Sequence, residues 1–152
     1  MTAETFLRPY RADDLDPALA LWRRAWDAAM PEIDFAARET WWRERWTREL
    51  VPNLSIVVAE RDGRVIGFVA INPATGWLDQ IVVDPALWSS GVAERLLAEA
   101  KRIAPSGIRL DVNQSNLRAI RFYERMCFER SGTGANPLSG APTFLYGWKP
   151  ER

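Results

Sequence analysis

Three observations predict an α/β fold of the α+β kind, a mixed and mostly antiparallel sheet flanked by helices. Three β-branched runs follow one another between residues 55 and 83 and are separated by turn residues, which is the pattern of an antiparallel meander. A strand, a helix and a strand then occupy residues 77–113, an order that favours a parallel crossover. The 152 residues with 47% hydrophobic content suit one core, so we expect a single domain over residues 1–152.

The first third of the chain predicts a short strand and two helices. Residues 6–10 are typical of an edge strand, because Pro9 lacks the N–H that a central strand needs. Apolar residues recur at helical spacing over 14–29, and a proline follows that stretch. Aromatic residues recur at similar spacing over 34–50, which predicts the second helix.

The meander itself is predicted to contain three strands. The first two runs, 55–59 and 65–71, are joined through Asp62-Gly63, which is a strong hairpin signal. The third run covers 77–83 and is stopped by Asp84-Pro85. Each strand is therefore expected to pair with the one before it.

The second half predicts two helices and three further strands. A helix over 90–104 leads into a strand over 108–113, and the crossover rule places that strand parallel to 77–83 in one sheet. Asn116 could cap a further helix that ends near Met126. The remaining strands are expected over 128–132 and 143–148, with a Pro/Gly-rich surface loop over 132–142.

Composition excludes several kinds of chemistry. The chain contains no histidine, which rules out Ser-His and Cys-His nucleophile pairs and zinc sites built with histidine. Cys127 is the single cysteine, so an internal disulfide and a cysteine-based zinc site are excluded, and we expect no metal. Any reaction must use carboxylates, hydroxyls, phenols, backbone amides or a bound cofactor.

Charge and hydropathy narrow the expected partners. The 20 basic and 20 acidic residues give a formal net charge of +0, so no long-range field gathers nucleic acid. No run of about 18 apolar residues is present to span a membrane. The N-terminal residues also lack the basic start and apolar run of a signal peptide. We therefore expect no nucleic-acid partner, no membrane association and a cytoplasmic location.

The segment after Asp84-Pro85 has features that suit phosphate binding. A strand, a loop and an amphipathic helix present free backbone amides at a helix N-terminus, which attracts phosphate oxygens. The small residues Gly91 and Ala93 would let a pyrophosphate approach the turn. A plain helix cap at Ser89 or Ser90 explains the same loop without any function.

Asn116 and Tyr123 lie on the next expected helix, where a cap and a half-buried aromatic account for each of them individually. In order and spacing, however, the chain resembles the GNAT superfamily of N-acetyltransferases, most closely over 78–128. Residues 81–85 and the loop ending in Gly91-Val92-Ala93 resemble the family's strand and its Gly-x-Ala or Gly-x-Gly loop. Residues 116–128 resemble its Asn-x-x-Ala-x-x-Phe-Tyr segment, which ends in Gly-Phe.

The resemblance implies that strands 77–83 and 108–113 splay apart and that acetyl-CoA, the acyl donor, inserts its pantetheine arm into the gap. Backbone groups of Ile81 and Val83 would bond the arm in the manner of an added strand. The amides of residues 88–93 would hold the pyrophosphate. The expected cofactor-binding residues are Ile81, Val82, Val83, Trp88, Ser89, Ser90, Gly91, Val92, Ala93, Asn116, Ala119 and Tyr123.

Three residues depart from the family pattern. Trp88 stands where the family usually has Gln or Arg, and Ser89 and Cys127 each stand where it usually has Gly. Ser89 could stiffen the loop or crowd a phosphate, which would weaken cofactor binding. We interpret Cys127, at a turn after a helix, as a packing residue rather than a nucleophile.

The expected chemistry needs a route for protons, because an alkylamine with a reference pKa near ~10.4 is protonated at neutral pH. Asp79 is the candidate base, since strand alternation puts it on one face with Ile81 and Val83, although a local bulge could reverse that facing. Orienting the acceptor's ammonium is an equally good interpretation of Asp79. In the family a tyrosine returns a proton to the departing thiol, and Tyr123 matches its position. A backbone donor near Val83 could stabilise the developing oxyanion.

The acceptor is less well defined by the sequence. Tryptophans four residues apart on both N-terminal helices are typical of core packing, although some of them, with Trp77, could wall a pocket for a cation. The candidate substrate residues are Trp26, Asp79 and Asn113. We favour a small-molecule amine as the acceptor, because a neutral chain with an aromatic-lined entrance suits a compact molecule. A protein or peptide amine and a non-catalytic acyl-CoA-binding module are the alternatives, and a homodimer stays open.

Overall fold

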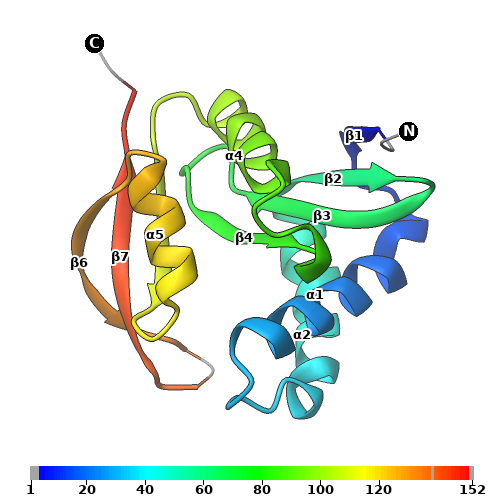
Figure 1. Cartoon of the computed structure of the whole chain (residues 1–152), viewed down its shortest axis with the longest axis horizontal. Coiled ribbons are helices and arrows are strands. Elements are labelled where there is room, and N and C mark those ends of the chain that lie inside the picture. The colour runs from blue at the N-terminus through cyan, green and yellow to red at the C-terminus, as the bar shows by residue number, and fades with distance from the viewer. Residues whose placement is uncertain (1–3, 138, 151–152) are drawn as a thin grey trace.

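The computed structural model describes residues 4–137 and 139–150, and its strands form two sheets (Figure 1). The strands are β1 (Thr5–Pro9), β2 (Ser55–Arg61), β3 (Arg64–Ile71), β4 (Leu78–Val83), β5 (Ile108–Asn113), β6 (Glu129–Ala135) and β7 (Pro142–Trp148). The first sheet has the order β1-β2-β3-β4 and the second the order β5-β7-β6, with antiparallel pairing throughout. The predicted meander and the predicted final strand pair are confirmed.

Within the described residues, the two sheets are joined by one isolated bridge. Trp77 and Arg109 form an isolated parallel bridge, and the Arg109 N–H donates to the Gly76 carbonyl at 3.0 Å. Beyond this bridge β4 and β5 diverge, so the expectation of one continuous sheet is wrong and the expectation of a splayed parallel pair is confirmed. We attribute the divergence to a bulge: Ile71 pairs with Leu78 and Ala70 with Gln80, which leaves Asp79 as an extra residue that bends β4.

Helices cover both faces of the first sheet (Figure 1). Alternate residues of β3 supply two separate hydrophobic clusters, because successive side chains of a strand point to opposite faces. Phe68 and Ala70 belong to the cluster under the first two helices, and Val69 and Ile71 belong to the cluster under the last two. The helices are α1 (Leu15–Ala29), α2 (Glu39–Arg45), α3 (Val51–Asn53), α4 (Val92–Ile103) and α5 (Leu117–Arg125).

The helix expected over 34–50 is not one regular helix. A 3₁₀ turn over Ala36–Arg38 precedes α2, and a π-helical turn over Trp46–Leu50 follows it before α3. The apolar residues Trp42, Trp46 and Leu50 recur every four residues and are all buried. Residues spaced four apart lie on one apolar stripe of a helical segment, which accounts for their common burial.

Two further boundaries differ from the prediction. Helix α4 begins at Val92 rather than at residue 90, because Gly91 takes a left-handed conformation with φ 94° as its N-cap. Strand β6 continues to Ala135, so the expected loop over 132–142 is shorter than its glycines indicated. Pairing of Gly134 with Thr143 of β7 holds this part of the chain in the sheet.

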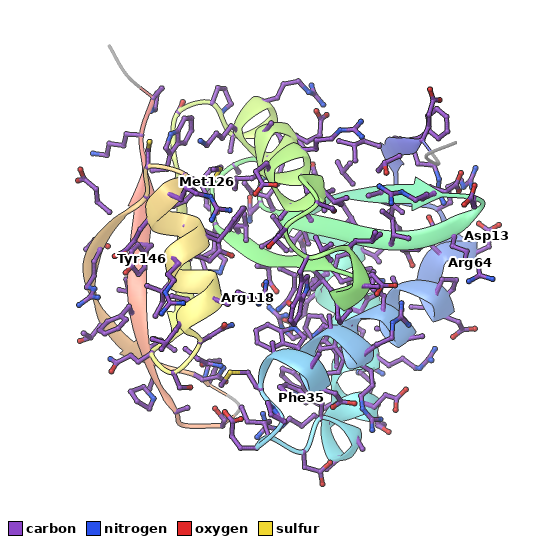
Figure 2. All side chains as sticks on the ribbon, in the orientation of Figure 1. Asp13, Phe35, Arg64, Arg118, Met126 and Tyr146 are labelled. Carbon is purple, nitrogen blue, oxygen red and sulfur yellow. The ribbon has the colours of Figure 1, made fainter. Side chains whose placement is uncertain are left out.

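Trp22, Trp42 and Trp46 of the N-terminal helical segments pack in the core, as their spacing predicted. Trp22 and Trp42 stack with their ring centroids 5.1 Å apart, and Trp46 is fully buried. Phe35, labelled in Figure 2, meets Trp22 edge-on at 5.6 Å. Such aromatic pairs add to the stability that burial of their area provides.

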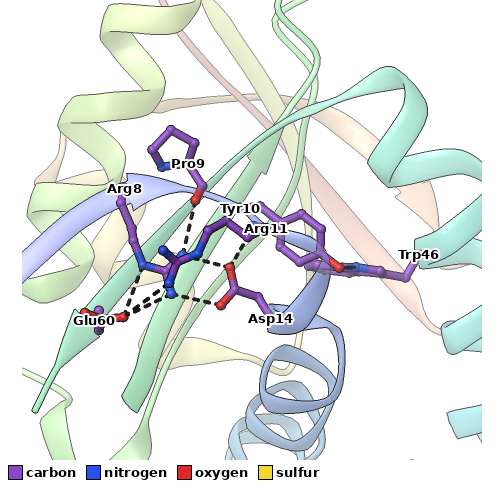
Figure 3. A network of polar contacts seen from close by, with 7 residues as sticks. All are labelled: Arg8, Pro9, Tyr10, Arg11, Asp14, Trp46 and Glu60. Atoms are coloured by element: carbon purple, nitrogen blue, oxygen red, sulfur yellow. Dashed lines mark hydrogen bonds and ion pairs between the residues drawn. The ribbon is translucent and has the colours of Figure 1, made fainter. Parts of the chain in front are cut away.

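An ion network fixes the start of α1 against β1 and β2 (Figure 3). Arg8 of β1 donates to both carboxylate oxygens of Asp14 at 2.8 Å and to Glu60 of β2. The hydrogen bond from Arg8 holds the pKa of Asp14 below its ordinary value. This anchor sets the position of α1, which carries part of the site. In the part of the chain that the structure describes, no helix has both the length and the apolar character to cross a membrane.

Candidate active site

A pocket occupies the gap between β4 and β5, where the two sheets separate. It is lined by α1, the β4–α4 loop and α5 as well as by the two strands. Most of the residues that the sequence marked out lie on its walls, and Ser90, Gly91 and Val92 do not. The expected residues that line it are Trp26, Asp79, Ile81, Val82, Val83, Trp88, Ser89, Ala93, Asn113, Asn116, Ala119 and Tyr123.

The walls of the pocket come from both sides of the fold. Ile81 and Val83 of β4 pack with the cluster that contains α4 and α5, whereas Val82 packs with the cluster under α1 and α2. On β5, Leu110 and Val112 face the α5 side, so alternation turns Asp111 and Asn113 the other way. On β5, the α4/α5 side of the gap is therefore apolar, whereas the α1/α2 side carries the polar side chains of Asp111 and Asn113.

The free edge of β4 exposes backbone hydrogen-bonding groups to the gap. Asp84 donates its N–H to Ile66 of β3 at 2.8 Å, and antiparallel pairing then turns the groups of Val82 toward β3 as well. Ile81 and Val83 consequently direct their N–H and C=O groups into the gap. The Val83 carbonyl already accepts a bond of 3.0 Å from the indole N–H of Trp88.

The N-terminus of α4 offers a smaller set of amides than the sequence led us to expect. Trp88 and Ser90 use their N–H groups inside the loop, on Pro85 at 3.3 Å and on Leu87 at 3.2 Å. Among the described residues no partner is found for the N–H groups of Ser89, Gly91, Val92, Ala93 and Glu94. These amides and the helix dipole favour an anion at this end of the pocket.

A stacked pair closes over this part of the gap. The guanidinium carbon of Arg118 lies 3.6 Å from the centroid of the Trp88 ring, so the β4–α4 loop touches α5. Figure 2 shows Arg118 projecting from α5 toward the middle of the molecule. Burial lowers the pKa of Arg118 from its ordinary value, yet a guanidinium keeps its charge at neutral pH. Within the described chain Arg118 has no acidic partner, and sequence reasoning missed this cation.

Helix α5 positions two of the predicted residues. The Asn116 side chain accepts the Ala119 N–H at 3.3 Å, which confirms the expected N-cap. Tyr123 lies one turn from the other end, and the Phe128 N–H donates to its carbonyl at 2.9 Å while the two rings pack at 5.5 Å. This Schellman motif with its hydrophobic contact fixes the Tyr123 backbone and ring. Burial raises the pKa of Tyr123 above its ordinary value, so the phenol stays protonated.

Cys127 occupies the left-handed position of that motif, with φ 69°. Its side chain is exposed, so its interpretation as a packing residue is wrong. The Schellman motif needs a residue in the left-handed conformation at this position. An L-residue in this conformation is strained by about 1–2 kcal/mol.

Replacing Cys127 with Gly should therefore stabilise the protein. We expect the free energy of unfolding to rise by about 0.5–1 kcal/mol, because the relieved strain exceeds the extra chain entropy of an unfolded glycine. Thermal unfolding followed by circular dichroism would detect this as a gain of about 1–4 °C. Cys127→Ala keeps the strained conformation and should give no gain, and equal gains in both variants would contradict the argument.

On the α1/α2 side, Asp79 is held by an arginine that the sequence did not reveal. Arg45 of α2 donates to one carboxylate oxygen of Asp79 at 2.8 Å and to the other as well. The bulge at Asp79 breaks the strict alternation of β4, so its carboxylate turns toward α2 instead of sharing a face with Ile81 and Val83. Arg45 is 34 residues away in the sequence, and no local pattern links the two.

The wall opposite Asp79 is polar. Asp111 and Asn113 of β5 line it together with Thr143 and Asn136. Asn113 accepts a hydrogen bond from Asn136 at 3.4 Å, and within the described residues the buried hydroxyl of Thr143 has no partner. Burial raises the pKa of Asp111, and the negative charge of Asp79 raises it further. Sequence reasoning missed Asp111, although its place between the inward-facing Leu110 and Val112 could have pointed to it.

Among the aromatic residues considered for the acceptor, only Trp26 meets the pocket. Its ring packs against Phe35 at 5.7 Å, and its other surface lines the wall that α1 provides. Trp77 lies at the bridge between the sheets and not among the residues that line this pocket.

A splayed strand pair with a helix N-terminus on one side and a buried phenol in the gap defines the acetyltransferase class. The chain matches the model of the Acetyltransferase (GNAT) family over residues 15–128 and belongs to that family. The family expected from the sequence, with its enzyme class, is thereby confirmed.

Named relatives act on different amines. YjaB of Salmonella typhimurium, a peptidyl-lysine N-acetyltransferase, is 29% identical over 138 residues, which cover 90% of this chain and 91% of that protein. An aminoglycoside N(6')-acetyltransferase type 1 of Klebsiella pneumoniae is 27% identical over 104 residues, or 58% of this chain and 52% of that protein. Both groups are N-acetyltransferases.

Solved structures share the fold. The PaiA N-acetyltransferase of Thermoplasma acidophilum, in complex with coenzyme A, superposes with a TM-score of 0.82 at 20% identity, covering 97% of this chain and 99% of that one. The apo form of YjaB from Escherichia coli gives a TM-score of 0.78 at 23% identity, covering 95% and 97%.

Proposed function

We propose that this protein transfers an acetyl group from acetyl-CoA to the primary amine of a small molecule, with Tyr123 as the general acid. The observation that carries the proposal is the course of the pocket. It leads from the free amides of Ser89, Ala93 and Glu94, past the buried phenol of Tyr123, to the polar wall on the α1/α2 side. Donor and acceptor would therefore meet beside Tyr123 from opposite sides.

The cofactor half fits coenzyme A. The free amides of Ser89, Ala93 and Glu94 and the cation of Arg118 line the pocket and suit its phosphates. The backbone groups of Ile81 and Val83 are available to its pantetheine amides, since β4 has an open edge here. Bound acetyl-CoA supplies the acetyl group as a thioester.

Tyr123 handles the proton of the leaving group. When the amine nitrogen bonds to the acetyl carbon, the C–S bond breaks and the sulfur keeps its electron pair. Tyr123 donates its phenolic proton to that sulfur, because its raised pKa keeps the proton in place until a strong base forms beside it. The nitrogen, which must lose a proton to become an amide, returns one to the phenolate. Tyr123 is then ready for the next turnover.

In this proposal Asp79 orients the acceptor rather than deprotonating it. Both of its carboxylate oxygens accept bonds from Arg45, so the pair is a fixed dipole on the acceptor side. Two charge-assisted hydrogen bonds to one guanidinium fix the orientation of this carboxylate. Asn113 and the Trp26 ring would form further parts of the acceptor wall.

A small polar amine fits the pocket better than a lysine side chain. In the described part of the chain, the buried side-chain oxygens of Gln80 and Thr143 have no hydrogen-bond partner, and both residues line the pocket. A lysine brings a four-carbon apolar stem next to its ammonium and would leave these oxygens unpaired. An amine whose neighbouring carbons carry hydroxyl or amino groups would pair with them.

Titration with coenzyme A by calorimetry, followed by assays of thiol release, tests the proposal. The amines would include polyamines, aminoglycosides, amino acids and lysine peptides. Micromolar binding with fastest release for a small polar amine supports it. Fastest release for a lysine peptide makes the chain a protein acetyltransferase, and binding without release leaves a non-catalytic acyl-CoA-binding module.

The bond between Trp88 and Val83 should weaken cofactor binding, because the indole N–H occupies a carbonyl that the pantetheine arm would use. Trp88→Phe keeps a ring for Arg118 and removes the donor. We expect the Kd for coenzyme A, measured by calorimetry, to fall about fivefold, since one hydrogen bond is worth about 1 kcal/mol. Trp148→Phe, which lies outside the pocket, is the control. Weaker binding by Trp88→Phe would show that the indole N–H serves the cofactor instead.

A further inference from the structure

Three carboxylates line the pocket, and they differ in their partners. Asp79 is paired with Arg45, and Glu94 is paired with Arg125 at 3.0 Å. Asp111 forms no ion pair within the described chain. An unpaired carboxylate in a pocket has its full capacity to bind a cation or a proton.

Asp111 lies where the two substrates would meet. It is on β5, across the gap from Asp79, and it turns toward the α1/α2 side because Leu110 and Val112 face α5. It is also close enough to Tyr123 for its charge to raise the pKa of that phenol. The carboxylate therefore sits between the polar acceptor wall and the proposed general acid.

The charges around Asp111 favour a bound proton. Its side chain is open to solvent through the mouth of the pocket, yet the surrounding walls raise its pKa, and the negative charge of Asp79 adds to the effect. Arg109 lies on the same face of β5, two residues before it, and a backbone hydrogen bond acts to lower the pKa. From α5, the titratable group that the charge of Asp111 affects is Tyr123, whose pKa the cation of Arg118 affects in the opposite direction. The balance of these groups leaves the carboxylate more basic than an ordinary aspartate.

We propose that Asp111 binds the ammonium form of the acceptor and takes the first of its two protons. This inference rests on the function proposed above. The N–H bond of the ammonium breaks, its electron pair stays on nitrogen, and the proton goes to a carboxylate oxygen of Asp111 and then to solvent through the open mouth. The neutral amine attacks, and its second proton goes to the Tyr123 phenolate. Two protons leave the nitrogen, one reaches the thiolate and one reaches solvent, so the balance closes.

The first arm of the test is kinetic and uses the amine that gives the fastest thiol release. Asp111→Asn should lower kcat/KM about 100-fold and leave the affinity for coenzyme A unchanged. The wild type should lose activity as the pH falls through the raised pKa of Asp111, because only the carboxylate form is active, and this loss should be absent from the variant. Asp79→Asn should lower kcat/KM less than Asp111→Asn. An unaltered kcat/KM and pH profile in Asp111→Asn would overturn the proposal.

The second arm needs no turnover. Carboxyl resonances of ¹³C-labelled aspartate are followed during a pH titration of the full chain with coenzyme A present. The aspartate resonance that is missing from the spectrum of Asp111→Asn should have its titration midpoint at a higher pH than the other aspartates. In Asp79→Asn this midpoint should move to a lower pH. Adding each amine of the panel should shift it, which supports the proposal even if no acceptor releases thiol. No shift with any amine would overturn the ammonium site, whereas a wild type without thiol release would count against the proposed function alone.

Discussion

Replacing Tyr123 with Phe is expected to reduce kcat about 100- to 1,000-fold, within the range that general acid catalysis contributes. The phenol has no hydrogen bond to another described side chain, so the protein loses only the group that would protonate the departing thiolate. The ring contacts with Phe122 and Phe128 are kept in the variant. Binding of coenzyme A should therefore stay within about twofold, since aromatic packing is unaltered.

Tyr146→Phe is the matched control. Tyr146 is fully buried and donates to Glu124 at 2.9 Å, but it lies outside the pocket. Its loss should cost about 1 kcal/mol of stability and leave kcat unchanged. Thiol release under saturating acetyl-CoA, measured beside an unfolding curve for each variant, separates the two effects. Equal kcat for Tyr123→Phe and the wild type would remove Tyr123 from the mechanism.

Gly76→Ala is expected to be the most damaging small substitution. A Cβ atom at this position would lie 2.3 Å from the Gly107 carbonyl oxygen, and the residue has φ 76°. The clash with the Gly107 carbonyl and the positive φ are both properties of the backbone, so no side-chain movement can remove them. The β3–β4 turn would have to move away from β5, which breaks the hydrogen bond from the Arg109 N–H to the Gly76 carbonyl. Strain and overpacking together should cost about 3–4 kcal/mol.

Gly63→Ala is the control that separates the cost of the positive φ from the cost of the clash with Gly107. Gly63 has a similar φ of 73°, and a Cβ atom there would meet nothing within 4 Å. Its loss of stability should be only about 1 kcal/mol, the cost of an alanine in a left-handed conformation. Urea unfolding of both variants measures the difference. Similar losses in the two would mean that the junction between the sheets tolerates the movement.

Local patterns were sufficient for most of the fold. The meander, α4 and α5 follow from runs of apolar residues, turn dipeptides and the Asn116 cap, each of which acts within a few residues. The separation of the sheets was not predictable from the crossover rule, because it depends on the bulge at Asp79 and on the pairing of β5 with β7. Such features are set by tertiary contacts, which the periodicity of a sequence does not report.

The residues of the site likewise fall into those that local patterns located and those that depend on tertiary contacts. The walls that belong to one continuous segment, such as the β4–α4 loop and the Tyr123 turn, were located from sequence. Arg45 and Asp111 were not, because their importance lies in what faces them from other elements. The interpretation of Asp79 as a base changed for this reason: the guanidinium that binds it comes from a helix 34 residues earlier.

The divergence of β4 from β5 also bears on the order in which the substrates bind. The donor side is bounded by α4 and α5, and the acceptor side by α1, α2 and the ends of β5 and β7. In the proposed arrangement the two ligands occupy different parts of the pocket, so neither covers the walls that hold the other. A compulsory order of addition would then have to come from changes that one ligand makes to the other's part of the pocket.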